Sequence, residues 1–217
     1  MKRWLWRCAR VALLALIACR KDADPDRQFW DWFVASAPGL AREAPEQAMD
    51  KIQFELTEIN LDISGEIAWG SDGSASRTLV LSAGGKHDSF PAVQELYAAR
   101  PQIAGWNVIA FRPRTATRPM PVVVHDGRSL APSDIKYVAV PSRGAGKLDV
   151  SLYVPGYQDD DAAIGLLVFL ALDHCVGEYD VETRIGVIHM LPLEQAPANA
   201  RSLDNLPADV DAIGSAG

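Results

Sequence analysis

The sequence lacks the short motifs that are typical of common catalytic and metal sites. No HExxH, CxxC or GxSxG pattern occurs anywhere in the 217 residues. Only four histidines are present, and they are widely spread: His87, His125, His174 and His189. A metal site needs three or four N, O or S ligands that converge. We therefore expect no metal, no cofactor and no catalytic residue, and we do not favour an enzymatic role.

The body of the chain also lacks a hydrophobic run long enough to cross a membrane. Its main apolar stretch, residues 162–172, has eleven residues. At about 1.5 Å rise per residue, such a helix falls well short of the roughly 30 Å of hydrocarbon in a bilayer. Asp159, Asp160 and Asp161 precede the stretch and Gly177 follows it, as is usual at helix starts and ends. Because the stretch is apolar on every side, we predict a fully buried core helix over about residues 160–176.

Basic residues are few. The formal net charge is -7, with 21 basic and 28 acidic residues. Four of the basic residues lie among the first ten, so the rest of the chain carries 17 basic against 28 acidic residues, a net charge of -11. An acidic surface repels nucleic acid, which we therefore exclude as a partner. A basic protein partner is one explanation of the charge, and a solvated acidic surface is the other.

The first 18 residues have the pattern of a secretory signal peptide, in which a basic segment precedes the apolar run of residues 11–18. The run ends in Leu16-Ile17-Ala18-Cys19, which resembles the bacterial lipobox. In lipobox precursors the cysteine thiol is diacylated and the chain is cut just before it. The resemblance implies a signal peptide over residues 1–18, lipid on Cys19, and an anchor and tether over residues 19–27. An uncleaved anchor or a soluble secreted protein are the alternatives.

The expected location is the cell envelope, with the membrane as partner through the lipid on Cys19. Arg20 follows the cysteine, where an aspartate would resemble an inner-membrane retention mark, so we favour the periplasmic face of the outer membrane. Cleavage would remove Cys8, and lipid would occupy Cys19. Cys175 would then have no partner for a disulfide, and we expect it to be a buried, inert thiol.

The pattern of helices and strands predicts an α+β fold, with about four helices packed on a mostly antiparallel sheet. Apolar residues at helical spacing predict helices near residues 29–34, 45–59 and 90–100. Strands are expected over 63–69, 78–82, 106–111, 121–125, 135–140, 148–154 and 183–190. We expect residues 28–192 to form a single domain and residues 193–217 to form a loosely packed acidic tail.

Four segments together resemble a family of uncharacterised bacterial proteins over roughly residues 29–190. The segments are Phe29-Trp30-Asp31-Trp32-Phe33, Ser82-Ala83-Gly84-Gly85 with Phe90 and Val93, Gly105 to Arg114, and Leu172-Asp173 with Gly177-Glu178-Tyr179-Asp180. That family has an FWxWF opening, an AFxPR strand and an LD…GEYD segment. No activity, cofactor or catalytic residue is assigned to it, so the resemblance implies none here. Its members mostly lack an export signal, unlike this chain.

The candidates for ligand contact are weak ones and fall in two groups. His174, Glu178 and Asp180 lie close together in sequence, and His174 and Glu178 have the spacing of neighbours on a helix face. Gly177 lies between them and is expected to break that helix. Arg112 and Arg114 follow an apolar strand and could bind a carboxylate or phosphate. For both groups the alternative is an ordinary structural role, as helix-end polar groups or surface arginines.

The loop Ser82 to His87 joins a predicted strand to a predicted helix, where backbone N–H groups could bind an anion. It lacks the first glycine and the Ser/Thr of a P-loop, so an ordinary glycine-rich turn is the alternative.

Three functions remain open. A membrane-anchored lipoprotein with a non-catalytic binding or scaffolding role is favoured. The alternatives are an envelope hydrolase that uses a His/acid cluster, and an acidic inhibitor or immunity-type protein. A pocket that joins His174 or His87 to nearby acids would favour the hydrolase. Loss of binding with added salt would favour the inhibitor.

Overall fold

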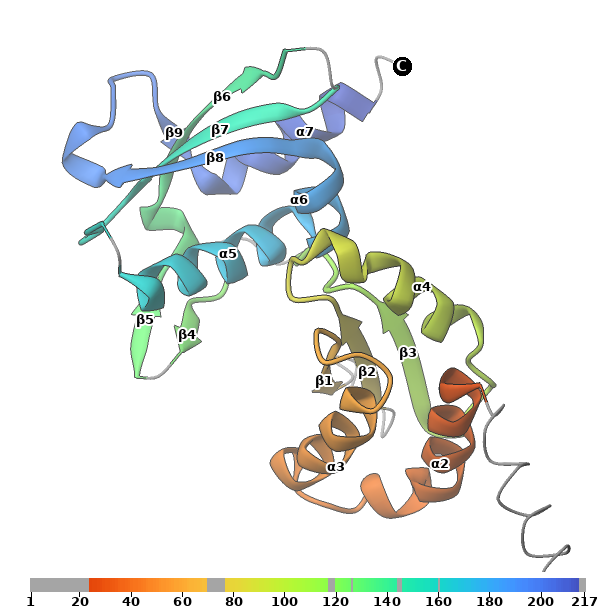
Figure 1. The fold of residues 1–217 in the computed structure, drawn as a ribbon. Coiled ribbons are helices and arrows are strands. Elements are labelled where there is room, and N and C mark those ends of the chain that lie inside the picture. The colour runs from red at the N-terminus through yellow and green to blue at the C-terminus, as the bar shows by residue number, and fades with distance from the viewer. Residues whose placement is uncertain are drawn as a thin grey trace, which may run out of the picture. The chain divides into compact units, whose positions relative to one another are not determined.

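The computed structural model describes residues 24–69, 77–116, 120–125, 127–143, 146–159 and 161–214. Within these residues it has six α-helices and three small sheets (Figure 1), which confirms the α+β class. The predicted signal peptide and Cys19 lie outside the described residues. The chain divides into two compact units: unit 1 is Met1–Leu81 with Asp88–Ile109, and unit 2 is Ser82–His87 with Ala110–Gly217. The single domain predicted over residues 28–192 therefore covers parts of both units.

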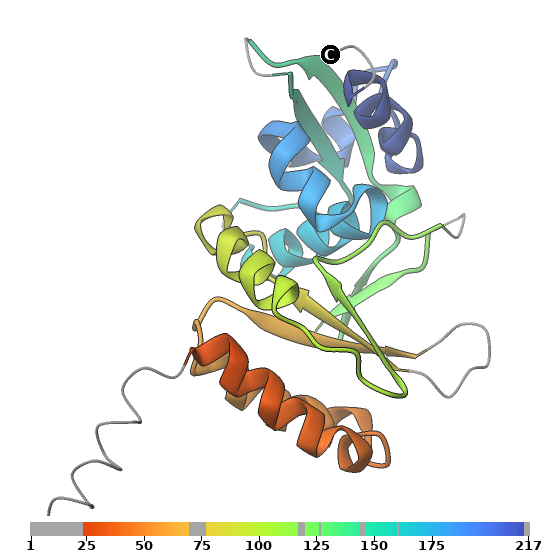
Figure 2. The ribbon, with the colours of Figure 1, turned by 90° about the vertical axis from the view of Figure 1, so that its right-hand side faces the viewer.

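Unit 1 is built on a three-stranded sheet with the strand order β1-β2-β3. Its strands are β1 (Ser64–Trp69), β2 (Arg77–Ser82) and β3 (Trp106–Ala110), and its helices are α2 (Pro25–Leu40), α3 (Pro45–Thr57) and α4 (Phe90–Ala98). Helices α2 and α3 lie side by side along the sheet (Figure 2). Gly65 allows α3 to pack closely on β1, since a Cβ atom at this glycine would lie 2.9 Å from the Met49 side chain.

The aromatic segment near the start of α2 contributes to the core of unit 1. Phe29, Trp30 and Phe33 of α2 are buried. The ring of Phe33 meets that of Trp106 edge-on at 5.0 Å, and the Trp30 Nε1–H donates to the Leu96 carbonyl at 2.7 Å. The helix predicted near residues 29–34 is confirmed as part of the longer α2. It packs on the core through Phe29, Trp30 and Phe33, whereas Trp32 is partly exposed and Val34 is exposed.

Unit 2 is built on a four-stranded sheet with the order β8-β7-β6-β9 and a separate hairpin of β4 and β5. The strands are β4 (Val123–His125), β5 (Arg128–Leu130), β6 (Lys136–Pro141), β7 (Leu148–Val154), β8 (Ile185–Pro192) and β9 (Arg201–Ser202). The helices are α5 (Ala162–Val176), α6 (Glu178–Arg184) and α7 (Leu206–Gly214). The predicted antiparallel pairing of residues 135–140 with residues 148–154 is confirmed by the register of β6 and β7.

The prediction of a mostly antiparallel sheet with about four helices needs correction in two respects. Strand β8 runs parallel to β7, because α5 and α6 connect the two strands and return the chain to the start of the sheet. Two short helices, α6 and α7, were not expected. The last strand was predicted to begin at residue 183, whereas β8 begins at Ile185. The predicted strand therefore overlapped the end of α6 and hid this short helix.

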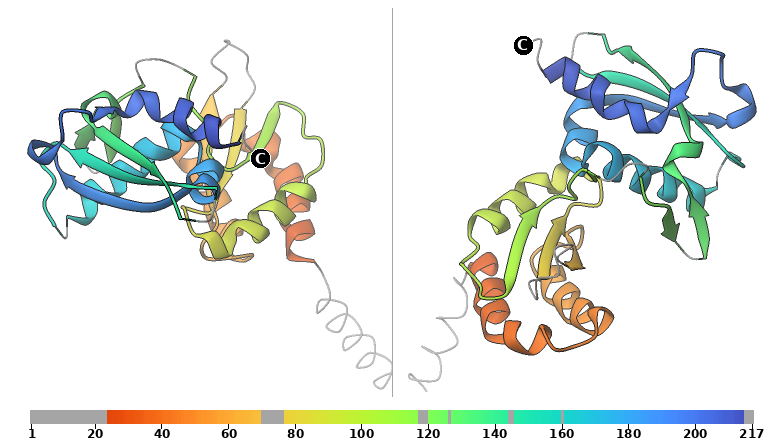
Figure 3. Two further views of the ribbon diagram at one scale, coloured as in Figure 1. Left: turned by 90° about the horizontal axis from the view of Figure 1, so that it is seen from above. Right: turned by 180° about the vertical axis from the view of Figure 1, so that it is seen from behind.

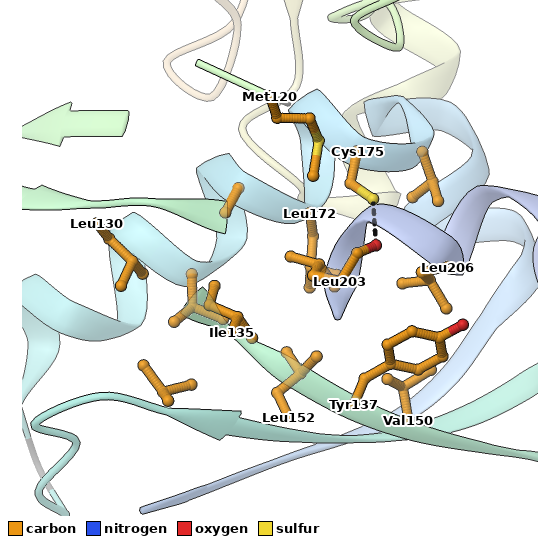
Figure 4. Packing of buried hydrophobic residues seen from close by; sticks show 14 of the residues in the cluster. Met120, Leu130, Ile135, Tyr137, Val150, Leu152, Leu172, Cys175, Leu203 and Leu206 are labelled. Carbon is orange, nitrogen blue, oxygen red and sulfur yellow. Dashed lines mark hydrogen bonds between the residues drawn. The ribbon is translucent and has the colours of Figure 1, made fainter. Parts of the chain in front are cut away.

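Helix α5 is a core helix but is not fully buried, so that prediction was wrong. The buried face includes Leu167, Val168, Ala171 and Leu172, and Figure 4 shows Leu172 and Cys175 among side chains of the sheet. On another face, Leu166 is 41% exposed and Phe169 is 44% exposed. Composition alone could not reveal this, because the exposed positions carry apolar residues as well. The predicted helix signals at Asp161 and Gly177 are confirmed as its two caps.

The tail predicted to be loosely packed is instead part of the core of unit 2. Leu203, Leu206 and Val210 are fully buried and belong to the same hydrophobic cluster as α5 and β7. Helix α7 lies along the four-stranded sheet (Figure 3). Most of the Ala, Pro and Asp residues of this segment are exposed or partly exposed, although Pro207 is buried. These residues hid the buried positions in the sequence pattern. Cys175, expected to be buried, is 0% exposed, and its Sγ donates to the Leu203 carbonyl.

Candidate functional site

The turn at Gly177 creates the most constrained part of unit 2. Helix α5 ends at Val176 and α6 begins at Glu178, so the expected helix break is confirmed. Gly177 has φ 92°, a backbone conformation that favours glycine. A Cβ atom here would lie 3.3 Å from the Arg114 backbone nitrogen. The glycine therefore lets the segment around Arg112 run close along the junction of α5 and α6 and places Glu178 beside it.

The Glu178 carboxylate is buried and accepts hydrogen bonds from two distant segments. Its Oε1 accepts from the Ser82 hydroxyl at 3.0 Å and from the Ala83 N–H at 2.9 Å. The Gly85 N–H lies 3.4 Å from the same oxygen. Its Oε2 accepts from the Arg112 N–H at 3.0 Å. The residue is only 1% exposed, so these donors replace the water that an ionised carboxylate would otherwise need.

The loop from Ser82 thus does bind an anion, as its glycines suggested, but the anion is a side chain of the same protein. Gly84 and Gly85 have φ values of 59° and 73°. Positive φ values favour glycine at both positions, and in this turn the Ala83 and Gly85 N–H groups face Glu178 whereas the Gly84 N–H donates to the Ser82 hydroxyl oxygen at 3.0 Å. Because Glu178 occupies this site, the loop is a structural element and is not an open phosphate cradle.

A buried ion pair adjoins this carboxylate. The Arg112 guanidinium donates to Asp173 Oδ2 at 3.0 Å, and its Nη1 also lies 3.9 Å from Glu178 Oε2. The Arg112 and Asp173 side chains are 13% and 9% exposed. We call Ser82, Arg112, Asp173 and Glu178 the carboxylate cluster. Every one of these residues comes from a segment on which the family resemblance rests.

Arg114 and Asp180 form a second, more exposed group. Arg114 makes two hydrogen bonds of 2.9 Å to the carboxylate of Asp211 and lies 3.5 Å from Asp180. The hydrogen bond from Arg114 lowers the pKa of Asp211, and the same bond raises the pKa of Arg114. Asp180 also lies 3.1 Å from Arg184, one turn further along α6. Arg114 therefore joins α7 to α6 and is engaged by the protein itself.

The five predicted contact residues consequently do not form one site. Arg112 and Glu178 lie in the carboxylate cluster, whereas Arg114 and Asp180 lie in the second group. The backbone carbonyl of His174 accepts from the Thr115 N–H at 2.8 Å and so holds the segment after Arg114 against the end of α5. The sequence spacing of His174 and Glu178 was misleading because Gly177 turns the chain between them.

A pocket of about 350 Å³ lies over the carboxylate cluster, entirely within unit 2. Its apolar wall includes Leu166 and Phe169, the two exposed positions of α5. Its polar wall includes Arg112, Lys147 and Glu182. The remaining lining residues are Gly84, Gly85, Leu170, Asp173, Glu178, Val181, Ile185, Gly186 and Ile188.

Sequence reasoning missed the part of the pocket that faces solvent. Lys147 donates to the Glu182 carbonyl at 2.9 Å, and Glu182 Oε1 lies 3.3 Å from His87 Nδ1. Lys147 and Glu182 are 35 residues apart and carry no sequence motif. The one usable signal was the apolar character of Leu166 and Phe169, which was interpreted as burial.

The described part of the chain shows neither a metal-ligand cluster nor a single membrane-spanning helix. Among those residues, no three His, Cys, Asp or Glu side chains are placed to hold a metal ion. In the same residues, no single helix has the length and hydropathy of a membrane span, although α5 and α6 together pass that test as a pair bent by 96°.

Fold and site together define an α+β protein with two compact units and an apolar pocket over a buried carboxylate cluster. Comparison with protein-family models, curated proteins and solved structures finds no match to this chain.

Proposed function

We propose that this protein is a lipid-anchored lipoprotein of the bacterial cell envelope that acts by binding, and that the unit 2 pocket is its ligand site. The pocket carries the proposal, because exposed apolar side chains on a core helix border a set of fixed polar groups. Sites for small molecules commonly combine apolar walls with a few polar groups in a volume of about 300–1,000 Å³.

The polar part of this pocket is rigid. The Arg112 backbone and side chain are both held, by Glu178 and Asp173 respectively. Groups fixed by such contacts lose little freedom when a ligand binds, which favours affinity. The apolar wall also favours binding. Phe169 is 44% exposed, and a ligand that covers it removes apolar surface from water, which lowers the free energy of the complex. A ligand with an apolar body and one polar group suits both walls.

Binding can be tested with the fluorescent probe 1-anilinonaphthalene-8-sulfonate, which combines an aromatic body with one anionic group. We expect saturable enhancement of its fluorescence by the full chain. Phe169→Asp should abolish the enhancement, because it places a charge on the apolar wall of the pocket. Val140→Asp is the matched control, since Val140 is 51% exposed on β6 and does not line the pocket. Equal enhancement by both variants would contradict the assignment of the site.

The anchor rests on the sequence Leu16-Ile17-Ala18-Cys19. Radiolabelled fatty acid should enter the wild-type protein and not Cys19→Ser, and the variant precursor should remain uncleaved. Labelling of Cys19→Ser to the same extent would show that the lipid is attached to another residue. Fractionation of the envelope should place the wild-type protein with the outer membrane.

A hydrolase is the second candidate, because His87 and the pocket residue Glu182 form a His/acid pair at 3.3 Å. The His87 side chain is 71% exposed and pairs with Glu182 from outside the lining of the pocket. The two carboxylates beneath the pocket, Asp173 and Glu178, are engaged by Arg112 and by backbone N–H groups. Ester hydrolysis that is lost in His87→Ala but kept in His125→Ala would favour this candidate.

A further inference from the structure

A groove between α2 and α3 is the main apolar concavity of unit 1. One stretch of about 700 Å³ is lined by Trp32, Ala35 and Pro38 of α2 and by Lys51 and Phe54 of α3, among others. A second stretch of about 530 Å³ is lined by Pro25, Phe29 and Ile59 together with Phe54. Phe54 and Glu55 line both stretches, and the second stretch includes Pro25, the first residue of α2. We refer to the two stretches together as the α2–α3 groove.

Large aromatic side chains are exposed in this groove. Phe54 is 66% exposed, and Trp32 is the one member of the opening aromatic segment that is partly exposed. A single exposed apolar residue is normal on a protein surface. Here two aromatic rings from adjacent helices border the same hollow, beside the small apolar residues Ala35 and Pro38. Such a grouping indicates a contact surface.

The position of this groove in the chain suggests what covers it. Cys19 precedes Pro25 by six residues, and six residues reach at most about 20 Å when fully extended. Pro25 itself lines the groove. If lipid is attached to Cys19, this end of the groove is held within about 20 Å of the bilayer, whatever path the tether follows.

We propose that the α2–α3 groove rests on the lipid bilayer, with Trp32 and Phe54 at the level of the lipid headgroups. This inference rests on the proposed lipid anchor at Cys19. Tryptophan is enriched at membrane interfaces because its ring is apolar and its N–H is polar. Arg42 lines the same groove, and its long side chain can reach headgroup phosphates.

The charge of the groove selects the type of lipid. Lys51 is paired with Glu43 at 2.7 Å, and Asp50 and Glu55 also line the groove. With Arg42 in the first stretch and Glu58 in the second, the groove has two basic and four acidic side chains, a negative surface that anionic lipids would repel. The surface therefore fits zwitterionic phosphatidylethanolamine and phosphatidylcholine.

The test uses the purified, lipidated protein in vesicles of these two lipids with brominated acyl chains, which quench nearby tryptophan fluorescence. We expect lipid-dependent quenching in the wild type and its loss in Trp32→Phe. The matched control is the double variant Trp32→Phe/Val34→Trp, which moves the fluorophore two residues along α2. Val34 is 46% exposed but does not line the groove, so quenching should not return. The remaining tryptophans are common to all three proteins.

The outcomes separate this inference from the anchor. Quenching by the brominated lipid that depends on Trp32 supports the proposal. If mass spectrometry shows lipid on Cys19 but Trp32 is quenched only by aqueous iodide, the groove faces water and the inference fails while the anchor stands. If neither reagent reaches Trp32, protein covers the groove, for example a second copy, and the inference again fails. Absence of lipid on Cys19 overturns both.

Discussion

Arg112 and Glu178 are joined by a reciprocal pair of hydrogen bonds. The Arg112 N–H donates to Glu178 Oε2 at 3.0 Å, and the Glu178 N–H donates to the Arg112 carbonyl at 3.0 Å. The same glutamate binds the Ser82 hydroxyl. The Glu178 side chain therefore fixes two segments of unit 2. The chain enters unit 2 at the start of these segments, at Ser82 and at Ala110. This arrangement leads to the first prediction.

Glu178→Ala should destabilise the protein strongly. The change leaves the Ala83 and Arg112 N–H groups and the Ser82 hydroxyl buried without their acceptor, and each buried unsatisfied donor costs about 1–3 kcal/mol. We expect a loss of at least about 3 kcal/mol in the free energy of unfolding, measured by urea denaturation. Glu182→Ala is the matched control, because its side chain is 29% exposed, and it should lose less than about 1 kcal/mol. Equal losses would contradict a special role for Glu178.

Arg112 and Asp173 should be strongly coupled in a double-mutant cycle. Removing one partner of a buried ion pair leaves an uncompensated charge and typically costs about 3–5 kcal/mol. Arg112→Met and Asp173→Asn should each be destabilising by such an amount. The double variant should lose clearly less than the sum of the two, because Asp173 is then not left as an uncompensated charge. The loss of the guanidinium beside Glu178, 3.9 Å away, remains in both Arg112 variants. Additive losses in chemical denaturation would show that the 3.0 Å contact contributes little.

Serine substitutions along α5 should distinguish its two faces. Leu167→Ser and Leu172→Ser remove fully buried side chains and should each cost about 2–5 kcal/mol through lost contacts and a cavity. Leu166→Ser and Phe169→Ser affect positions that are 41% and 44% exposed, and they should change the melting temperature little. A scan with losses at all four positions would restore the interpretation of α5 as a fully buried helix.

The C-terminal helix should be required for the stability of unit 2. Val210→Asp places a carboxylate at a fully buried position of α7, which costs several kcal/mol and is comparable to the whole stability of a typical domain, about 5–15 kcal/mol. Ala212→Asp is the control on the same helix, at an exposed position. Circular dichroism during heating should show a lowered or absent transition only for Val210→Asp. Two unchanged melting curves would mean that the tail is dispensable.

Tyr137 should make the protein less stable at high pH. Burial raises the pKa of Tyr137 above its ordinary value, and the hydrogen bond to Asp209 adds to the effect. In the unfolded chain tyrosine loses its proton near pH 10, whereas the folded protein keeps it. The folded state then binds more protons, so stability falls as pH rises above about 10 and is unaffected below that value. Tyr137→Phe should flatten this fall when urea denaturation is repeated from pH 8 to pH 11.

The helix and strand ranges were largely predictable because their signals are local. Pro45 at the start of α3, and Asp161 and Gly177 at the ends of α5, act on backbone groups within one turn of the helix. The alternation of buried and less buried residues from Leu148 to Leu152 in β7 is likewise visible in the sequence of the strand itself. The errors concern burial and tertiary pairing. Helix α5 has an exposed apolar face, α7 packs in the core despite the polar composition of its segment, and β8 pairs parallel to β7.

The sequence by itself determined the α+β class, the break at Gly177 and the list of charged residues that could form a site. Only the tertiary structure decided which of them meet. Glu178 binds Arg112, 66 residues away, and Ser82, 96 residues away, whereas the backbone carbonyl of His174, four residues away, accepts from Thr115. The physical reason is that a buried carboxylate must replace its lost water with donors brought from anywhere in the fold. Spacing along the chain predicts only neighbours within one regular helix or strand. The turn at Gly177 interrupts the helix directly before Glu178, the residue on which the site depends.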